Sequence, residues 1–193
     1  MTLTSGARIF AGASQPMPAS SSQLLVAVEG ARAIVKVCGR ASFTCSAGFK
    51  SLVYDLRARG YRSFMLDLTE CVIMDSTFLG ILARFAQRLS EGGPNAGSLV
   101  LLNPSVRILD LLDNLGVAPL FNVERGMDPL ARHCEQVAPP ATGDEKIAAA
   151  RAALEAHETL MELNPANVPK FKDVTRFMAE DLQKLERRPL PGA

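Results

Sequence analysis

Residues 67–82 read Asp-Leu-Thr-Glu-Cys-Val-Ile-Met-Asp-Ser-Thr-Phe-Leu-Gly-Ile-Leu, and the fold assignment depends on this stretch. The apolar run at 71–74 predicts a β-strand, and it ends at Asp-Ser-Thr, three residue types that commonly begin helices. From Phe78 onward, apolar side chains recur every three or four residues, which predicts an amphipathic helix. Ser76 is therefore expected at or beside the N-cap of a helix that directly follows a strand.

Strand-like and helix-like segments alternate on both sides of this stretch. We expect strands at residues 24–28, 33–38, 63–68, 98–102 and 120–123, and further helices at residues 42–59, 105–115 and 127–137. The first two strands are joined by a short connection containing Gly30, which predicts a β-hairpin. The alternation predicts an α/β fold with a mixed, mainly parallel sheet and with helices on one face.

The chain divides by composition into four parts. Residues 1–22 are rich in Ser, Ala, Gly and Pro and are expected to be disordered, and the α/β domain spans residues 23–137. Residues 138–143 form a Pro-containing linker, and residues 144–188 predict an αα-hairpin. Its second helix carries an apolar stripe of Phe171, Val174, Met178, Leu182 and Leu185. Because two helices alone bury too little, this stripe should pack on the first domain, on a second copy or on a partner.

Composition excludes several classes of function. The formal net charge is +1 and aromatic residues make up 6% of the chain, so neither nucleic acid nor an anionic membrane is an expected partner. No segment reaches the roughly 20 apolar residues of a membrane span, and the start lacks the pattern of a signal peptide. The cysteine and histidine spacings match no metal site or redox pair, and Cys71 is expected to be a buried, inert thiol. We expect a cytoplasmic protein without a metal or cofactor.

A hydroxyl at the expected position of Ser76 is suited to modification. The first backbone N–H groups of a helix lack intrahelical partners, and the helix N-terminus favours negative charge. A phosphate would add about −1.5 to −2 charges there without unfolding the domain. The alternative interpretation is that Asp75, Ser76 and Thr77 only cap a helix, and that Gly80 only permits close packing.

A longer pattern resembles the STAS domains, the family of bacterial anti-sigma-factor antagonists. The pattern comprises a strand ending in Asp-Leu, a spacer, Met-Asp-Ser-Thr at residues 74–77 and Leu-Gly-Ile-Leu at residues 79–82. The order of the surrounding elements agrees, including Val-Cys-Gly-Arg at residues 37–40 and Asp-Asn-Leu-Gly at residues 113–116. The resemblance covers residues 24–137 and does not extend to the C-terminal helices.

The resemblance implies a phosphorylation-switched protein-interaction module and not an enzyme. The expected partner is a serine kinase that also restrains a sigma factor and that phosphorylates Ser76 using ATP. Asp75 would position the hydroxyl, Thr77 would be a secondary acceptor, and a metal-dependent phosphatase would reset the switch. Residues 75–78 and Gly80 form the expected docking segment.

One departure from the family pattern concerns Phe78, which stands where the family usually has glycine. We favour Phe78 as a core residue, and the alternative is that it lies in the docking surface. Two other functions stay open: a non-switching scaffold or homodimerisation module, and a binder of an anionic ligand. His133 and His157 predict surface or structural roles. The C-terminal hairpin could mask the switch, form a dimer or contact a partner, and the sequence does not choose.

Overall fold

The computed structural model describes residues 22–91, 93, 96–137 and 145–187. Two predictions lie outside these residues: the disordered start apart from Ser22, and the linker at 138–143, together with the two end residues, 144 and 188, of the predicted hairpin. Within the described residues, no helix is both long enough and apolar enough to cross a bilayer.

The strands of the described chain form one seven-stranded mixed sheet. They are β1 (Gln23–Glu29), β2 (Arg32–Ala41), β3 (Ser63–Asp67), β4 (Cys71–Met74), β5 (Ser98–Leu102), β6 (Asn122–Glu124) and β7 (Glu135–Gln136). Their order is β6-β5-β3-β2-β1-β7, with β4 paired to the far end of β2. β1 pairs antiparallel with both of its neighbours, while β2, β3, β4, β5 and β6 pair in parallel. The predicted hairpin and the mainly parallel sheet are confirmed.

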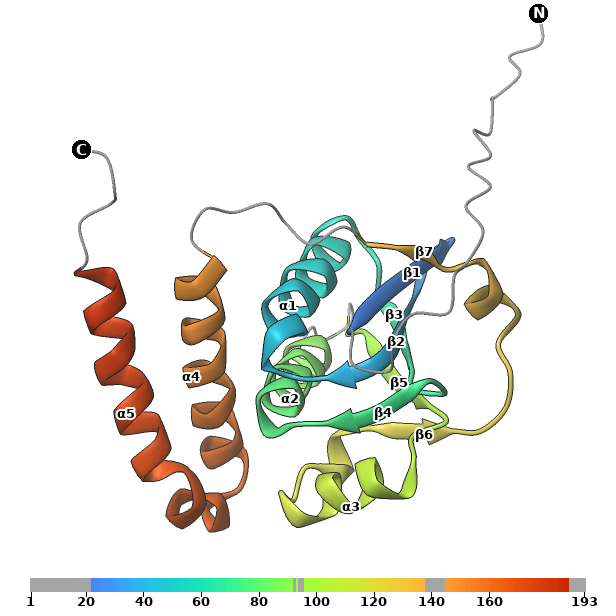
Figure 1. Cartoon of the computed structure of the whole chain (residues 1–193). Coiled ribbons are helices and arrows are strands. Elements are labelled where there is room, and N and C mark those ends of the chain that lie inside the picture. Colours follow the sequence, from blue (N-terminus) through green and yellow to red (C-terminus); the bar gives the residue numbers. More distant parts are fainter. Residues whose placement is uncertain (1–21, 92, 94–95, 138–144, 188–193) are drawn as a thin grey trace, which may run out of the picture.

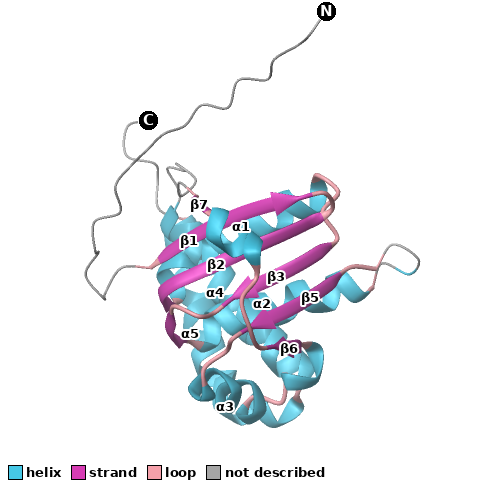
Figure 2. Ribbon diagram, turned by 90° about the vertical axis from the view of Figure 1, so that its right-hand side faces the viewer, coloured by secondary structure: helices cyan, strands magenta, loops and turns pink. Residues whose placement is uncertain are grey.

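The described chain has five α-helices, and all but α3 lie on one side of the sheet (Figure 1). They are α1 (Phe43–Ala58), α2 (Ser76–Ser90), α3 (Val106–Asn114), α4 (Glu145–Leu163) and α5 (Val168–Glu186). α1 and α2 pack directly on the sheet, α4 packs on α1 and α2, and α5 packs on α4. Figure 2 shows the sheet from its other face, with these helices behind it and α3 near the edge strand β6.

The main core fills the space between the sheet and α1 and α2. Phe78 and Phe49 are at most 1% exposed, and their ring centroids lie 4.5 Å apart. Phe85 packs edge-on against Phe64 of β3 at 4.9 Å. These aromatic contacts fix α2 on the sheet, and with it the position of Ser76 at the start of that helix.

The helix predicted at residues 127–137 is wrong. A 3-10 turn spans Pro129–His133, and β7 follows it and pairs with the otherwise free edge of β1. Asp128 begins the turn by accepting a hydrogen bond from the Leu130 amide at 2.9 Å. The apolar spacing that suggested a helix instead places Leu130 against Ile34 on the second face of the sheet.

The two C-terminal helices form the predicted hairpin: α4 packs on α1 and α2 of the chain's own α/β domain, and α5 packs on α4. Leu160 of α4 belongs to the main core, and Phe171 of α5 packs against it. The predicted stripe needs one correction, because Val174 is 40% exposed while Thr175 is buried. The Thr175 hydroxyl bonds to the carbonyl of Phe171 at 3.0 Å, so a buried polar residue occupies the place assigned to an apolar one.

Candidate functional site

Ser76 is the first residue of α2, and Asp75 is its N-cap. The Asp75 backbone is extended, with φ −100° and ψ 170°, and its Oδ1 accepts a hydrogen bond from the Phe78 amide at 2.9 Å. One of the four unpartnered N–H groups at this helix end is satisfied in this way. The sequence prediction that Ser76 lies beside an N-cap is confirmed.

Asp75 also connects α2 to α1. Its second carboxylate oxygen, Oδ2, accepts a hydrogen bond from the amide of Phe43, the first residue of α1, at 2.8 Å. A single carboxylate therefore binds the N-termini of two neighbouring helices, where negative charge is favoured. The role expected for Asp75, that of positioning the Ser76 hydroxyl, remains a prediction; the contacts observed are with backbone amides.

A β-bulge in β2 positions the end of β2 beside the junction of β4 and α2. Gly39 adopts a positive φ of 80°, and the pairing register of β2 with β4 shifts between Gly39 and Arg40. Glycine accommodates this left-handed conformation at little cost, and such bulges bend a strand. Beyond the bulge, the carbonyl of Ala41 accepts a hydrogen bond from the Asp75 amide at 2.9 Å. The bend therefore fixes the backbone directly before Ser76.

The Ser76 hydroxyl contacts a histidine from the hairpin. Ser76 Oγ lies 3.0 Å from His157 Nε2, and His157 Nδ1 lies 2.8 Å from the carbonyl oxygen of Ala153. Because a carbonyl only accepts, Nδ1 is the donor to Ala153, and in that tautomer Nε2 accepts a hydrogen bond from the Ser76 hydroxyl. His157 is 4% exposed, and Phe171 packs edge-on against it, with ring centroids 4.9 Å apart.

The other expected docking residues point into the molecule. Thr77 is 5% exposed and Phe78 is 0% exposed, so Phe78 belongs to the core and offers no side-chain surface to a partner. Burial of the Thr77 hydroxyl favours Ser76 as the more accessible acceptor. Gly80 faces α4, and a Cβ added to it would lie 2.3 Å from the carbonyl oxygen of Ala156. Close helix packing at Gly80 is therefore observed, and its contact is the C-terminal hairpin.

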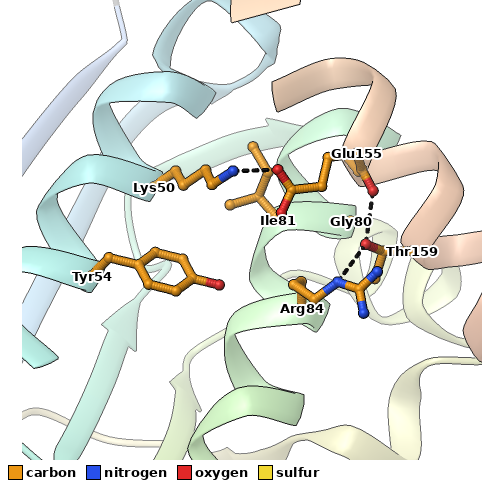
Figure 3. Close-up of a pocket in the computed structure, with 8 residues that line it drawn as sticks. Lys50, Tyr54, Gly80, Ile81, Arg84, Glu155 and Thr159 are labelled. Carbon is orange, nitrogen blue, oxygen red and sulfur yellow. Dashed lines mark hydrogen bonds and ion pairs between the residues drawn. The ribbon is translucent and has the colours of Figure 1, made fainter. Parts of the chain in front are cut away.

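Charged and polar side chains surround this close contact (Figure 3). Lys50 of α1 forms an ion pair with Glu155. Arg84 of α2 donates to the Thr159 hydroxyl at 2.9 Å and pairs with Glu162 at 2.6 Å. The small pocket lined by Lys50, Arg84, Glu155 and Thr159, among others, is too narrow to admit a water molecule. α4 is therefore closely packed along α1 and α2 and leaves no ligand site in this pocket.

The turn between α4 and α5 is attached to the C-terminal end of α3. Asn167, which is fully buried, donates to the carbonyl oxygens of Leu115 and Leu160, each at 2.9 Å. Lys170 Nζ donates to the Asn114 carbonyl at 2.8 Å. The last carbonyls of a helix lack intrahelical donors, and the hairpin supplies them here.

Sequence reasoning gave His157 a surface or structural role and left the packing of the hairpin open, so it did not identify the contact between His157 and Ser76. His157 lies 81 positions from Ser76, and nothing in the sequence pattern related the two. The run of alanines in α4 and the glycine at position 80 were the available signal, because small residues allow two helices to approach closely. That signal does not identify which helix is the partner.

Burial disfavours the thiolate form of the four cysteines of this chain. Burial is the largest cause that raises the pKa of Cys38, to about 12, and hydrogen bonding to Glu70 adds to it. Burial also raises the pKa of Cys45, Cys71 and Cys134. Cys71 is 5% exposed, as expected for a buried thiol. In the part of the chain that the structure describes, no three His, Cys, Asp or Glu side chains are grouped to hold a metal ion.

Comparisons with solved structures agree with this fold. An anti-sigma factor antagonist from Mycobacterium paratuberculosis aligns with a TM-score of 0.50 at 17% identity, covering 62% of this chain and 97% of its own. The unphosphorylated anti-sigma factor antagonist SpoIIAA aligns with a TM-score of 0.46 at 18% identity, and the alignment covers 58% of this chain and 93% of SpoIIAA. The phosphorylated form of the Bacillus SpoIIAA aligns with a TM-score of 0.47 at 18% identity, and the alignment covers 58% of this chain and 97% of SpoIIAA. At 17% identity, the alignment with the mycobacterial structure concerns the fold alone.

No curated protein sequence matches the chain. The family model for the STAS domain matches residues 23–129, which is more than half of the chain and includes β1 through α3 and the Ser76 junction. The match ends before α4, so the helical hairpin lies outside the family pattern. On this evidence, the chain belongs to the STAS domain family.

Proposed function

We propose that this protein is a phosphorylation-switched binding module, cytoplasmic and not an enzyme, whose partner is a serine kinase that also acts as an anti-sigma factor. The observation that carries the proposal is the position of Ser76 as the first residue of α2 in a STAS domain. In phosphorylation, the γ-phosphoryl group of ATP passes to Ser76 Oγ, the hydroxyl proton passes to a base of the kinase, and ADP leaves.

The local electrostatics support a phosphate at this position. The amides of the first turn of α2 point toward Ser76, and the helix dipole favours added negative charge. Phosphorylation adds about −1.5 to −2 charges and strong hydrogen-bond acceptors. The domain fold does not depend on the unmodified hydroxyl, because Asp75 supplies the N-cap. A phosphate therefore changes the surface while β4 and α2 stay in place.

Exposed apolar residues near Ser76 support a protein partner. Val72 and Ile73 of β4 are 59% and 39% exposed, and Phe43, whose amide binds Asp75, is 42% exposed. Large apolar side chains that stay exposed close to a modification site are available for burial by a partner protein. The proposed kinase would bury some of these side chains and present ATP to the Ser76 hydroxyl.

A second candidate function is a constitutive scaffold, in which Ser76 only holds the hairpin. The hydrogen bond between Ser76 and His157 favours this candidate. The two functions differ in their response to negative charge at residue 76. Capture of the same partner by wild type and by Ser76→Asp would favour the scaffold, whereas loss of the partner in Ser76→Asp would favour the switch.

The direct test is phosphorylation of the full chain in extract from its own source with ATP, read site by site by mass spectrometry. Ser76→Ala removes the acceptor, and Ser90→Ala is the matched control at the exposed opposite end of the same helix. We expect phosphate on Ser76 in wild type and in Ser90→Ala. Absence of phosphate from Ser76, with partners captured equally by wild type and Ser76→Ala, would refute the switch.

A further inference from the structure

The C-terminal hairpin lies on the same surface that the proposed kinase must reach. α4 packs along α2 from its first turn, and it also contacts α1. His157 Nε2 is within hydrogen-bond distance of Ser76 Oγ, at 3.0 Å. An attacking hydroxyl must be free to align with the γ-phosphorus of ATP, and the kinase must surround it. Ser76 is half-buried with α4 in place, and its hydrogen bond to His157 has to break before phosphoryl transfer.

The closest contact between the two helices has no spare room. Gly80 lies so close to Ala156 that a Cβ would meet three backbone atoms of that residue, at 2.3, 2.7 and 2.8 Å. Ala152, Ala153 and Ala156 of α4 are at most 4% exposed. The surface of α2 at Gly80 therefore accommodates a helix with small side chains, and α4 of the same chain packs there.

Much of the interface is of a kind that can open. Alanine side chains remove little apolar area from water, so α4 gains less from burial than a leucine-rich helix would. The ion pairs Lys50–Glu155 and Arg84–Glu162 are partly exposed, with the Glu162 side chain 62% exposed, and such pairs contribute little to stability. Leu160 is the large apolar side chain of α4 that is fully buried.

We propose that the hairpin is an internal cover of Ser76, and that the kinase binds only the fraction of molecules in which α4 has left α1 and α2. This inference rests on the proposed function. When the competent state is a minor fraction of the population, the apparent affinity of the kinase falls by that fraction. The kinase and the hairpin then compete for one surface, and their coupling is reciprocal.

The test compares three full-length proteins. Ala156→Arg introduces a cation where the side chain is 0% exposed, whereas Ala148→Arg makes the same change at an exposed position of the same helix. Arginine is nearly as good a helix former as alanine, so α4 stays helical in both. Hydrogen exchange of α1, α2 and α4 reports folding and docking, and mass spectrometry reports the rate of Ser76 phosphorylation in extract with ATP.

We expect Ala156→Arg to accelerate Ser76 phosphorylation by at least about tenfold over wild type and Ala148→Arg, because burial of an unpaired charge disfavours the covered state strongly. Exchange in α4 should rise while α1 and α2 stay protected. Equal phosphorylation rates in all three proteins, with α4 released in Ala156→Arg, overturn the cover and leave the switch intact. Absence of phosphate on Ser76 in every protein overturns the proposed function itself.

A second variant decides the question if Ala156→Arg loses protection in α1 and α2 as well. The double variant Glu155→Lys/Glu162→Lys replaces the two glutamates that pair with Lys50 and Arg84 by lysines, so that each ion pair becomes a repulsion between like charges. Both glutamate side chains are partly exposed, so the substitutions leave the domain core unchanged. The cover predicts a several-fold faster phosphorylation of Ser76 in this protein. An unchanged rate, with α4 exchange increased, overturns it.

Discussion

Gly80→Ala isolates the contact between the STAS domain and its hairpin. The new methyl group would lie 2.3 Å from the Ala156 carbonyl oxygen, and ordinary contacts of this kind begin near 3.4 Å. The atoms in the way belong to the backbone of α4, so no side chain can rotate aside. The two helices must separate by about 1 Å, or the hairpin must leave.

The magnitude follows from two opposing effects. Overpacking a close contact costs about 1–3 kcal/mol, which corresponds to a roughly 5–150-fold loss of the docked state. Replacing glycine by alanine inside a helix stabilises that helix by up to about 1 kcal/mol. α2 itself should therefore become more stable while α4 becomes less firmly docked, and this opposite pair of effects distinguishes interface strain from general destabilisation.

Hydrogen exchange followed by mass spectrometry measures both effects in one experiment. Amides in α4 that exchange through undocking should exchange faster by the factor given above, and amides in α2 should not. Gly48→Ala is the matched control, because Gly48 lies within α1 and a Cβ there would meet nothing within 4 Å. If α4 exchanges at the same rate in wild type, Gly80→Ala and Gly48→Ala, the reasoning from the close contact is refuted.

Three further predictions concern stability, each measured by chemical denaturation. Asp75→Asn keeps an acceptor for only one of the two amides that Asp75 binds and turns an NH₂ group toward the other, so we expect a loss of about 1–2 kcal/mol; no loss would contradict the double cap. Asn167→Ala removes two buried hydrogen bonds and should cost about 1–3 kcal/mol, more than exposed Lys170→Ala, and the reverse order would contradict the anchoring of the turn. Hydrogen bonds from Lys36 first and then Cys38 hold the pKa of the Glu70 carboxyl below its ordinary value of 4.5, so Glu70→Gln should cost less than about 1 kcal/mol near neutral pH. That deficit should disappear as the pH falls below 4.5 through the lower folded value, and a deficit that grows on acidification would contradict the assignment.

Most of the α/β domain was predictable because its signals are local. Strands such as Ser98–Leu102 are short apolar runs, and Asp75 and Ser105 are helix caps whose side chains accept the expected amide hydrogen bonds. The segment after β6 was not predictable in the same way. Leu130 has helical spacing relative to its neighbours, but its burial against the second face of the sheet depends on β7 pairing with β1, which is a tertiary interaction.

The site was predictable in part for the same reason. Ser76 and Asp75 follow from the order of strand, cap and helix, whereas the contact with His157 follows from the docking of a hairpin that the STAS family pattern does not include. Three packing partners for the hairpin's apolar stripe were equally consistent with the sequence: the first domain, a second copy of the chain, or another protein. The structure shows α4 on the chain's own domain, in close contact with Gly80, and the α5 stripe against α4, and both contacts require coordinates.

If the hairpin covers Ser76, the kinase and the hairpin compete for the surface around that residue. Hydrogen exchange in α4 should therefore be measured on the full-length wild-type protein, alone and saturated with the kinase captured from extract. We expect kinase binding to accelerate exchange in α4, because binding selects the molecules whose hairpin has left. Slower or unchanged exchange in α4 on kinase binding would contradict it, since the kinase would then bind with the hairpin in place.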